Sequence, residues 1–294
     1  MGKFINPFTD YGFKKIFGQD FNKDFLIDFL NVLLEGERHI VDINYVDKEL
    51  LPAVKSERGI IYDVFCTTDT GEHIIVEMQN RIQAHFEDRA LFYLSGDIHR
   101  QGARGDWDYS LVPVYGIYFM NWKFQEGNKG KLRTDVGLTD LSTGKLFTDR
   151  MRMIFIQVPL MTKGEEECEN DFERWIYILK NMETLTRMPF AAQKAIFDRL
   201  GSIAEIEAMD EPERSMYDES LRVYRDNLAV ARGEWERGHQ EGRQEGRQEG
   251  RQEGRQEGRV ESAMEIAKNM KLLGLDIPTI CKATRLTQEQ IEKL

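Results

Sequence analysis

Two acidic residues lie in strand-like segments at positions where their side chains could bind one metal ion. The segments Ile60–Thr68 and His73–Met78 are rich in apolar and β-branched residues, and Asp69–Glu72 between them has the composition of a tight turn. These features predict two antiparallel strands joined by a hairpin turn. The register of such a hairpin can bring Asp63 and Glu77 close together at neighbouring strand positions.

Period-two alternation also assigns the faces of these strands. Asp63 shares its face with Ile61 and Phe65, and Glu77 shares its face with Gln79. Two carboxylates at adjacent strand ends repel unless a cation bridges them, and oxygen ligands with open water positions suit Mg²⁺ or Mn²⁺. Such an ion polarises a phosphodiester oxygen and activates water, so the pattern indicates a metal-dependent hydrolase. Spacing alone leaves an alternative open, in which Asp63 is an edge-strand polar residue and Glu77 lies on a solvated face.

The surrounding segments alternate between helical and strand-like patterns. Apolar residues at helical spacing predict helices over 21–34 and 83–101, and the chain after residue 171 reads as helix. The predicted strands cover residues 40–51, 60–68, 73–78, 111–121, 134–140 and 153–159. This order predicts an α/β fold in which a mixed sheet is flanked by helices and followed by an all-helical C-terminal region.

Three groups of residues in this layout resemble a known family. They are the N-terminal sequence Asp10-Tyr11-Gly12-Phe13-Lys14-Lys15-Ile16-Phe17-Gly18, the strand pair with Asp63 and Glu77-Met78-Gln79, and the helix with Phe86, Arg89 and Tyr93. Together they resemble the PD-(D/E)XK nucleases and, more narrowly, the recombination-promoting nuclease family, also described as PD-(D/E)XK nuclease family transposases. The resemblance covers roughly residues 1–200 and implies a restriction-endonuclease-like fold. A Gly-Arg-Gln-Glu tract with a helical tail is also typical of the family.

The resemblance implies roles for single residues. It makes Asp63 and Glu77 metal ligands and DNA the substrate, and it places Gln79 where the family usually has a catalytic lysine. A neutral amide can orient water, but it cannot supply a positive charge to the attacking water or the transition state. Another group must therefore supply that charge. The candidates are Lys14 in the N-terminal motif and Arg89, whose fork of donors could alternatively hold the scissile phosphate.

Further charged residues extend the predicted site. Lys15 is a candidate cation beside Lys14. Additional carboxylates for the metal are Asp10, Asp47 and Glu49. The cations expected to position DNA are Arg81, Arg89, Arg100 and Arg104. The five histidines show no HxxxH or HxH spacing, so we do not expect a zinc site.

Composition and charge limit the remaining functions. Of the 294 residues, 41% are hydrophobic and 31% are charged, which is ordinary for a soluble globular protein. There is no apolar run of about 20 residues and no secretory signal pattern, so we expect a cytoplasmic protein with no membrane partner. The net charge of -11 argues against a broad basic surface. Any DNA contact must therefore be local.

The C-terminal region carries a strict four-residue repeat, Gly-Arg-Gln-Glu. Its glycines are Gly238, Gly242, Gly246, Gly250, Gly254 and Gly258. Glycine costs a helix up to about 1 kcal/mol per interior position, and a period of four places like charges four residues apart. The glycines would, however, leave a bare stripe that another helix can approach closely. We therefore predict a helix that promotes self-association, with a solvated spacer as the alternative.

The tail has the outline of two short helices. Ile277-Pro278 can open one helix, and Thr287 with Gln290 has the capping-box pattern that opens another. Helix, turn and helix together resemble a helix-turn-helix. We interpret the tail as a small packing or assembly module, with DNA reading as the alternative.

The sequence thus predicts four regions and one leading function. The regions are a nuclease-like domain over 1–165, a helical extension over 166–230, the repeat helix or linker over 231–259, and a helical tail over 260–294. The leading function is a metal-dependent DNA endonuclease linked to recombination or mobile elements. The alternative is a catalytically weak or inactive nuclease-like scaffold that self-assembles through its C-terminal helices.

Overall fold

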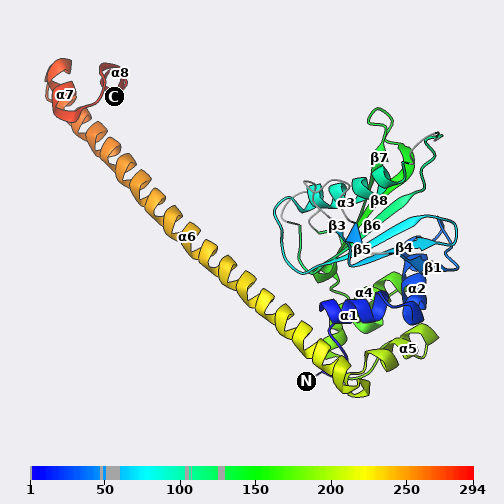
Figure 1. Ribbon diagram of the computed structural model, residues 1–294. Helices are drawn as coiled ribbons and strands as arrows, with labels where there is room; N and C mark the ends of the chain where they lie inside the picture. The colour runs from blue at the N-terminus through cyan, green and yellow to red at the C-terminus, as the bar shows by residue number, and fades with distance from the viewer. Residues whose placement is uncertain (1, 47–48, 51–59, 103–105, 107, 125–129) are drawn as a thin grey trace. The chain divides into compact units, whose positions relative to one another are not determined.

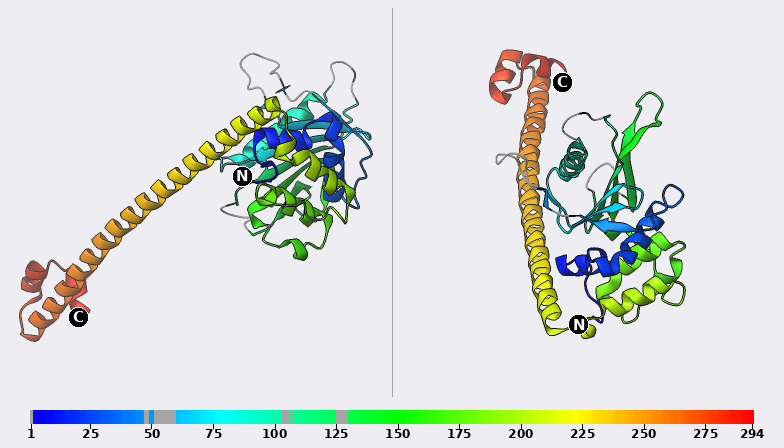
Figure 2. Two further views of the ribbon diagram at one scale, coloured as in Figure 1. Left: turned by 90° about the horizontal axis from the view of Figure 1, so that it is seen from below. Right: turned by 45° about the vertical axis from the view of Figure 1, so that its right-hand side comes forward.

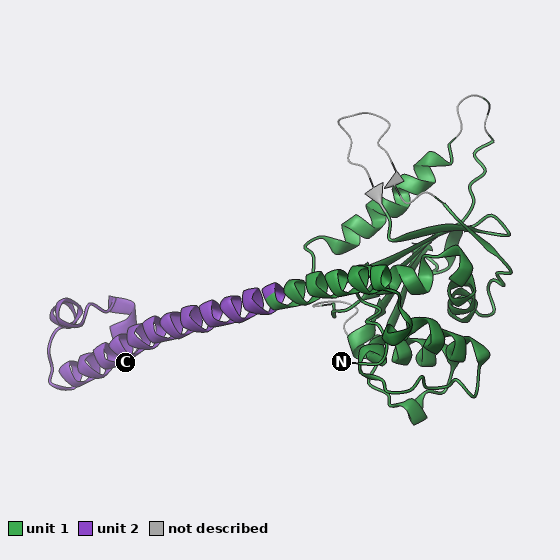
Figure 3. Ribbon diagram, turned by 60° about the horizontal axis from the view of Figure 1, so that its bottom comes forward, with its two compact units in different colours: residues 1–229 green, residues 230–294 purple. Residues whose placement is uncertain are grey.

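The computed structural model describes residues 2–46, 49–50, 60–102, 106, 108–124 and 130–294, with only the main chain at 49–50 and 60–61. The chain divides into two compact units, residues 1–229 and 230–294, which Figure 3 colours separately. The first unit contains the sheet and the helices that cover it. The second consists of helices alone.

A six-stranded mixed sheet forms the centre of the first unit (Figure 1). In spatial order its strands are β1 (Ile43–Tyr45), β4 (Val64–Thr68), β5 (His73–Gln79), β6 (Val114–Met120), β8 (Leu146–Gln157) and β7 (Arg133–Thr139). β4 is antiparallel to both β1 and β5, β7 is antiparallel to β8, and β5, β6 and β8 are parallel. The carboxyl ends of the three parallel strands therefore meet at one edge of the sheet.

Helices pack on both faces of this sheet, as Figure 2 shows for α1 and α2 on one side and α3 on the other. One face is covered by α1 (Asp10–Phe17), α2 (Lys23–Leu33), α4 (Asp171–Asn181) and α5 (Ala195–Ala204). The other face is covered by α3 (Phe86–Arg100), which buries Phe86, Ala90 and Leu94 against the strands. Two hydrophobic cores result, one on each side of the sheet.

The remaining elements are short, apart from one long helix. The two-residue strands β2 (Glu49–Leu50) and β3 (Ile60–Ile61) pair with each other outside the main sheet. The 3₁₀ turns are η1 (Asp20–Asn22), η2 (Val158–Leu160), η3 (Glu165–Glu167), η4 (Met182–Thr184) and η5 (Ile206–Ala208). α6 runs from Glu211 to Leu272 and is followed by α7 (Ile277–Thr284) and α8 (Gln288–Glu292). No helix in the described ranges is long and apolar enough to cross a membrane.

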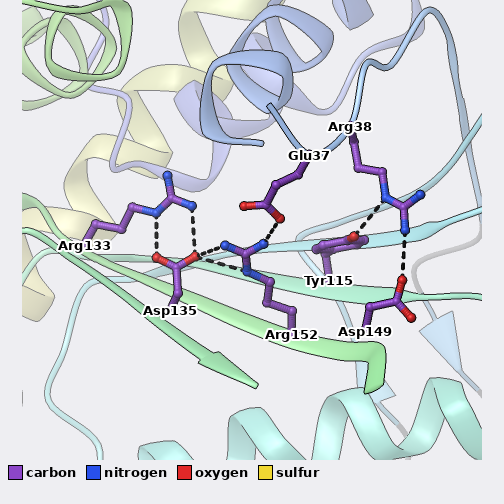
Figure 4. Close-up of polar contacts among 7 residues, drawn as sticks. All are labelled: Glu37, Arg38, Tyr115, Arg133, Asp135, Asp149 and Arg152. Atoms are coloured by element: carbon purple, nitrogen blue, oxygen red, sulfur yellow. Dashed lines mark hydrogen bonds and ion pairs between the residues drawn. The ribbon is translucent and has the colours of Figure 1, made fainter. Parts of the chain in front are cut away.

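A network of charged side chains ties the end of α2 to the sheet (Figure 4). Arg152 of β8 bonds Glu37, which follows α2, and its Nη2 lies 2.6 Å from Asp135 Oδ1 on β7. Arg38 donates to Tyr115 Oη at 3.3 Å and to Asp149 Oδ2 at 3.2 Å. These pairs hold the β7–β8 hairpin beneath the α2 layer, at the opposite end of the parallel strands from their carboxyl edge.

The predicted fold class is confirmed, and three strand predictions need correction. The segment 40–51 is not one strand, because it contains β1 and β2, which belong to different sheets. The segment 60–68 breaks at Tyr62 and Asp63. β8 also begins at Leu146, seven residues before the predicted start, because a turn closed by Asp140 and Gly144 extends the hairpin.

The two short helices of the second unit begin where their capping residues predict. The repeat lies entirely within α6, so the prediction that it is helical is confirmed. Asp276 caps α7, and Thr287 caps α8 in a capping box with Gln290. A small apolar cluster that includes Ile280 and Ile291 packs the two short helices against the end of α6.

Candidate active site

The acid pair lies where β4 begins and β5 nears its end. The chain bends at Asp63, one residue before β4, and Glu77 is the fifth residue of β5. Val64 and Val76 form the last pair of the β4–β5 ladder, so Asp63 and Glu77 occupy the next position in the register. The structure thus brings the two acids together on adjacent antiparallel strands.

Each carboxylate bonds to the main chain beside the other. Glu77 Oε1 accepts a hydrogen bond from the Asp63 N–H at 3.3 Å, and Asp63 Oδ2 accepts one from the Met78 N–H at 2.8 Å. The second bond takes the place of a ladder bond that a continuous strand would have made to Met78. This substitution of a side chain for a backbone partner accounts for the break in the predicted strand 60–68.

Strand geometry also directs a main-chain oxygen of Met78 toward this group. In a strand, the N–H and C=O of one residue point to the same side. Because the Met78 N–H points to Asp63, the Met78 carbonyl faces the side on which Asp63 lies. Two carboxylates and one carbonyl are a donor set of hard oxygens, which fits a divalent cation that keeps several water ligands.

Burial makes the acid pair unstable in its doubly charged form. The Glu77 side chain is 2% exposed. Burial and the negative charge of Asp63 raise the pKa of Glu77 to about 8, and the positive charge of Arg89 opposes this shift. A divalent cation would offset both the burial and the repulsion from Asp63 that raise this pKa. Within the described residues, no group of three or more His, Cys, Asp or Glu side chains gathers as a metal site.

Gln79 lies beside Glu77 on the face that α3 covers. Ile75 of the same strand packs into the core under α3, whereas Val76 and Met78 pack into the opposite core. Gln79 Nε2 donates to Glu77 Oε2 at 3.2 Å, which leaves Gln79 Oε1 as the atom that can accept a bond from water. Gln79 therefore holds Glu77 in place and can orient water, but it brings no positive charge.

Arg89 approaches the acids from α3. Its guanidinium stacks on the Tyr93 ring, with Cζ 4.9 Å from the ring centroid, and Nη1 donates to Gln83 Oε1. Its charge lowers the pKa of Glu77, which places it within electrostatic reach of the pair. Arg89 is thus a cation of α3 within electrostatic reach of the acid pair.

Lys14 and Lys15 lie on α1, which packs on the face opposite α3. Lys14 Nζ pairs with Asp10 at 2.6 Å and the side chain is 40% exposed, whereas Lys15 is buried and pairs with Glu213 at 2.7 Å. The start of α1 lies beside the carboxyl end of β5, because Asn80 Nδ2 donates to the Phe8 carbonyl at 2.7 Å. Lys14 consequently remains a candidate, while Lys15 is engaged in packing α6 against α1.

The other predicted residues fall at the edges of the site or beyond the described residues. Arg81 follows β5, and Arg100 ends α3. Asp47 and Arg104 lie outside the described residues, and so does the side chain of Glu49. Sequence reasoning missed the Met78 carbonyl and two buried tyrosines, Tyr62 and Tyr118, that neighbour the acids. The tyrosines could have been suspected only from their positions next to the acids.

Comparison with known families agrees with this geometry. Residues 7–234 match the family model of the PD-(D/E)XK nuclease family transposases. The chain belongs to this family. The match covers the acid pair and α3 of this family member and ends before the first repeat glycine, Gly238. No curated protein and no solved structure gives a match. Membership of the PD-(D/E)XK nuclease family transposases implies a nuclease with DNA as its substrate, in a group of enzymes that usually use divalent metal ions.

Proposed function

We propose that this protein is a metal-dependent DNA endonuclease that cleaves phosphodiester bonds with Asp63 and Glu77 as its metal ligands. The observation that carries the proposal is the convergence of these two carboxylates, each bonded to the main chain beside the other. A buried acid pair with a raised pKa at a strand edge is costly for stability, and such arrangements occur at functional sites.

The oxygen-only donor set favours Mg²⁺ or Mn²⁺. Asp63, Glu77 and the Met78 carbonyl would hold the ion. When bound, it would polarise a phosphodiester oxygen and lower the pKa of a water molecule. Gln79 Oε1 accepts a hydrogen bond from the attacking water and so orients it, and Arg89 supplies the positive charge that the family's lysine would otherwise bring.

DNA binding is local in this proposal. The net charge of -11 disfavours non-specific association, so Arg81, Arg89 and Arg100 near the site contact the phosphates. We place the reaction in the cytoplasm, in recombination or mobile-element processing. Each of the three cysteines, Cys66, Cys168 and Cys281, is a free thiol, which agrees with a reducing compartment.

Cleavage of supercoiled plasmid tests the proposal. Wild-type protein should nick the plasmid in the presence of Mg²⁺ or Mn²⁺, and EDTA should stop this nicking. Asp63→Ala should abolish nicking while leaving the circular dichroism spectrum unchanged. Asp149→Ala is a matched control, because it removes an acid at the far end of the sheet. Equal nicking by wild type and Asp63→Ala would refute the assignment.

We also propose that the protein self-associates through the repeat in α6. The glycines from Gly238 to Gly258 lie in a continuous helix, and an added methyl group at any of them would meet no atom within 4 Å. The stripe is therefore open to a second helix. Self-association through α6 is compatible with an active enzyme and also with the alternative in which the nuclease domain is an inactive scaffold.

A further inference from the structure

Two buried tyrosines reach from the strands of the active site to the backbone of α3. Tyr62 Oη donates to the Tyr93 carbonyl at 3.0 Å, and Tyr118 Oη donates to the Ala90 carbonyl at 3.1 Å. Both tyrosines are buried, with 1% of each residue exposed. The strands and the helix are thus joined by polar bonds as well as by apolar packing.

Each tyrosine lies beside one of the acids, Tyr62 in the break before β4 and Tyr118 on β6. Tyr62 directly precedes Asp63, and Tyr118 of β6 is the register partner of Glu77. A displacement of either acid relative to α3 would therefore stretch one of these hydroxyl bonds. Both hydrogen bonds are therefore donated by residues of the sheet that lie next to the proposed metal ligands.

On the helix side, the same bonds end beside Arg89. Ala90 is the next residue, and Tyr93 lies one turn further along α3 with its ring beneath the Arg89 guanidinium. The Tyr62 ring meets the Tyr93 ring edge to face, with centroids 5.8 Å apart and an angle of 80°. Tyr62 therefore supports Tyr93 through both its ring and its hydroxyl.

These hydroxyl bonds are not needed to satisfy the helix. In an α-helix each carbonyl already accepts from the N–H four residues later, and a carbonyl has a second lone pair for a further donor. The bonds to Ala90 and Tyr93 therefore specify where α3 sits over the sheet. Burial raises the pKa of both tyrosines, so both hydroxyls stay protonated at neutral pH and can donate.

We propose that Tyr62 and Tyr118 are positioning residues for the nuclease reaction. They fix the position of α3 over the sheet and so direct Arg89 to the Asp63–Glu77 pair. This inference rests on the proposed function. A purely structural role would make the tyrosines contribute to stability without any coupling to Arg89. The two roles differ in whether the effects of the substitutions depend on Arg89.

The test uses Tyr62→Phe and Tyr118→Phe, which keep the rings and remove the hydroxyls. Tyr45→Phe is the matched control, because Tyr45 Oη donates to the Phe17 carbonyl at 2.8 Å on the opposite face of the sheet. Single-turnover nicking with Mn²⁺ is measured for each variant alone and in the Arg89→Ala background. DNA affinity is measured by fluorescence anisotropy in EDTA over a series of salt concentrations.

Each substitution at the two positions should slow nicking about 3- to 10-fold and should have no further effect in the Arg89→Ala background. Each should also reduce the salt dependence of DNA binding as Arg89→Ala does, by up to about 0.9 in the logarithmic slope for one lost phosphate contact. Tyr45→Phe should leave both quantities unchanged.

The positioning role would be overturned if the rate losses of the tyrosine variants multiplied with the rate loss of Arg89→Ala. It would also be overturned if Tyr45→Phe lost as much nicking rate as the two tyrosine variants. Wild-type protein that binds DNA without nicking it would refute the proposed cleavage, and the salt slopes would still decide whether the tyrosines position Arg89. Wild-type protein that neither binds nor nicks DNA would overturn both proposals.

Discussion

Metal binding should release a proton from the acid pair, because Glu77 holds a proton when no cation is present. Its pKa is raised from the ordinary 4.5 to about 8, so the protonated form dominates at neutral pH. A metal ion binds the carboxylate and displaces that proton. We expect close to one proton released per Mn²⁺ at pH 7.0 and a clearly smaller number at pH values above the pKa of Glu77. The Mn²⁺ affinity should rise about tenfold per pH unit up to about pH 8 and then level off.

Isothermal titration calorimetry in buffers with different ionisation enthalpies measures this release directly. The Glu77→Gln variant should release almost no proton and bind Mn²⁺ far more weakly. Glu72→Gln is a matched control, because Glu72 is also buried and lies at the other end of the same hairpin. Burial opposes ionisation there too, but bonds from the Thr68 and Thr70 hydroxyls and the charge of Arg38 leave the pKa of Glu72 lowered.

The outcome separates this site from an unrelated metal site. Glu72→Gln should release the same number of protons as wild type. Release of no proton at pH 7.0 by wild type would contradict the buried acid pair as the binding site. Undiminished release by Glu77→Gln would place the metal elsewhere.

Two further predictions concern the missing lysine and the repeat. Gln79→Lys should retain or raise the rate of single-turnover cleavage. Arg89→Ala or Lys14→Ala should lower that rate by about 10²–10³ if the replaced residue supplies the charge. Equal background rates in wild type and these three variants would refute catalysis. Deleting residues 238–259 should lower the oligomeric mass in light scattering, and Gly246→Ala with Gly250→Ala should do the same although alanine favours the helix. An unchanged oligomeric mass in both variants would mean that the repeat is only a spacer.

Local pattern was enough to predict the strand pair and the meeting of the acids. The alternation of Val76, Glu77 and Met78 has a period of two, and the turn after Thr68 sets an antiparallel register, so both follow from neighbouring residues. The family match over residues 7–234 confirms the resemblance that the motifs indicated. The roles of the single site residues stay predictions until they are tested.

Contacts between distant segments could not be read from the sequence. The break at Tyr62 depends on a hydrogen bond that the Met78 N–H donates to the Asp63 carboxylate, fifteen residues away in the sequence. The support of α3 depends on Tyr62 and Tyr118, which are separated from Tyr93 and Ala90 by 31 and 28 residues. Such bonds depend on tertiary packing, and residue spacing carries no signal for them.

The central claim is that Asp63 and Glu77 form one divalent metal site. Anomalous diffraction from crystals grown with Mn²⁺ measures this most directly. We predict one strong anomalous peak within about 2.5 Å of oxygen atoms of both Asp63 and Glu77. A peak that contacts only one of them, or a Mn²⁺ ion bound elsewhere with none between them, would contradict the claim.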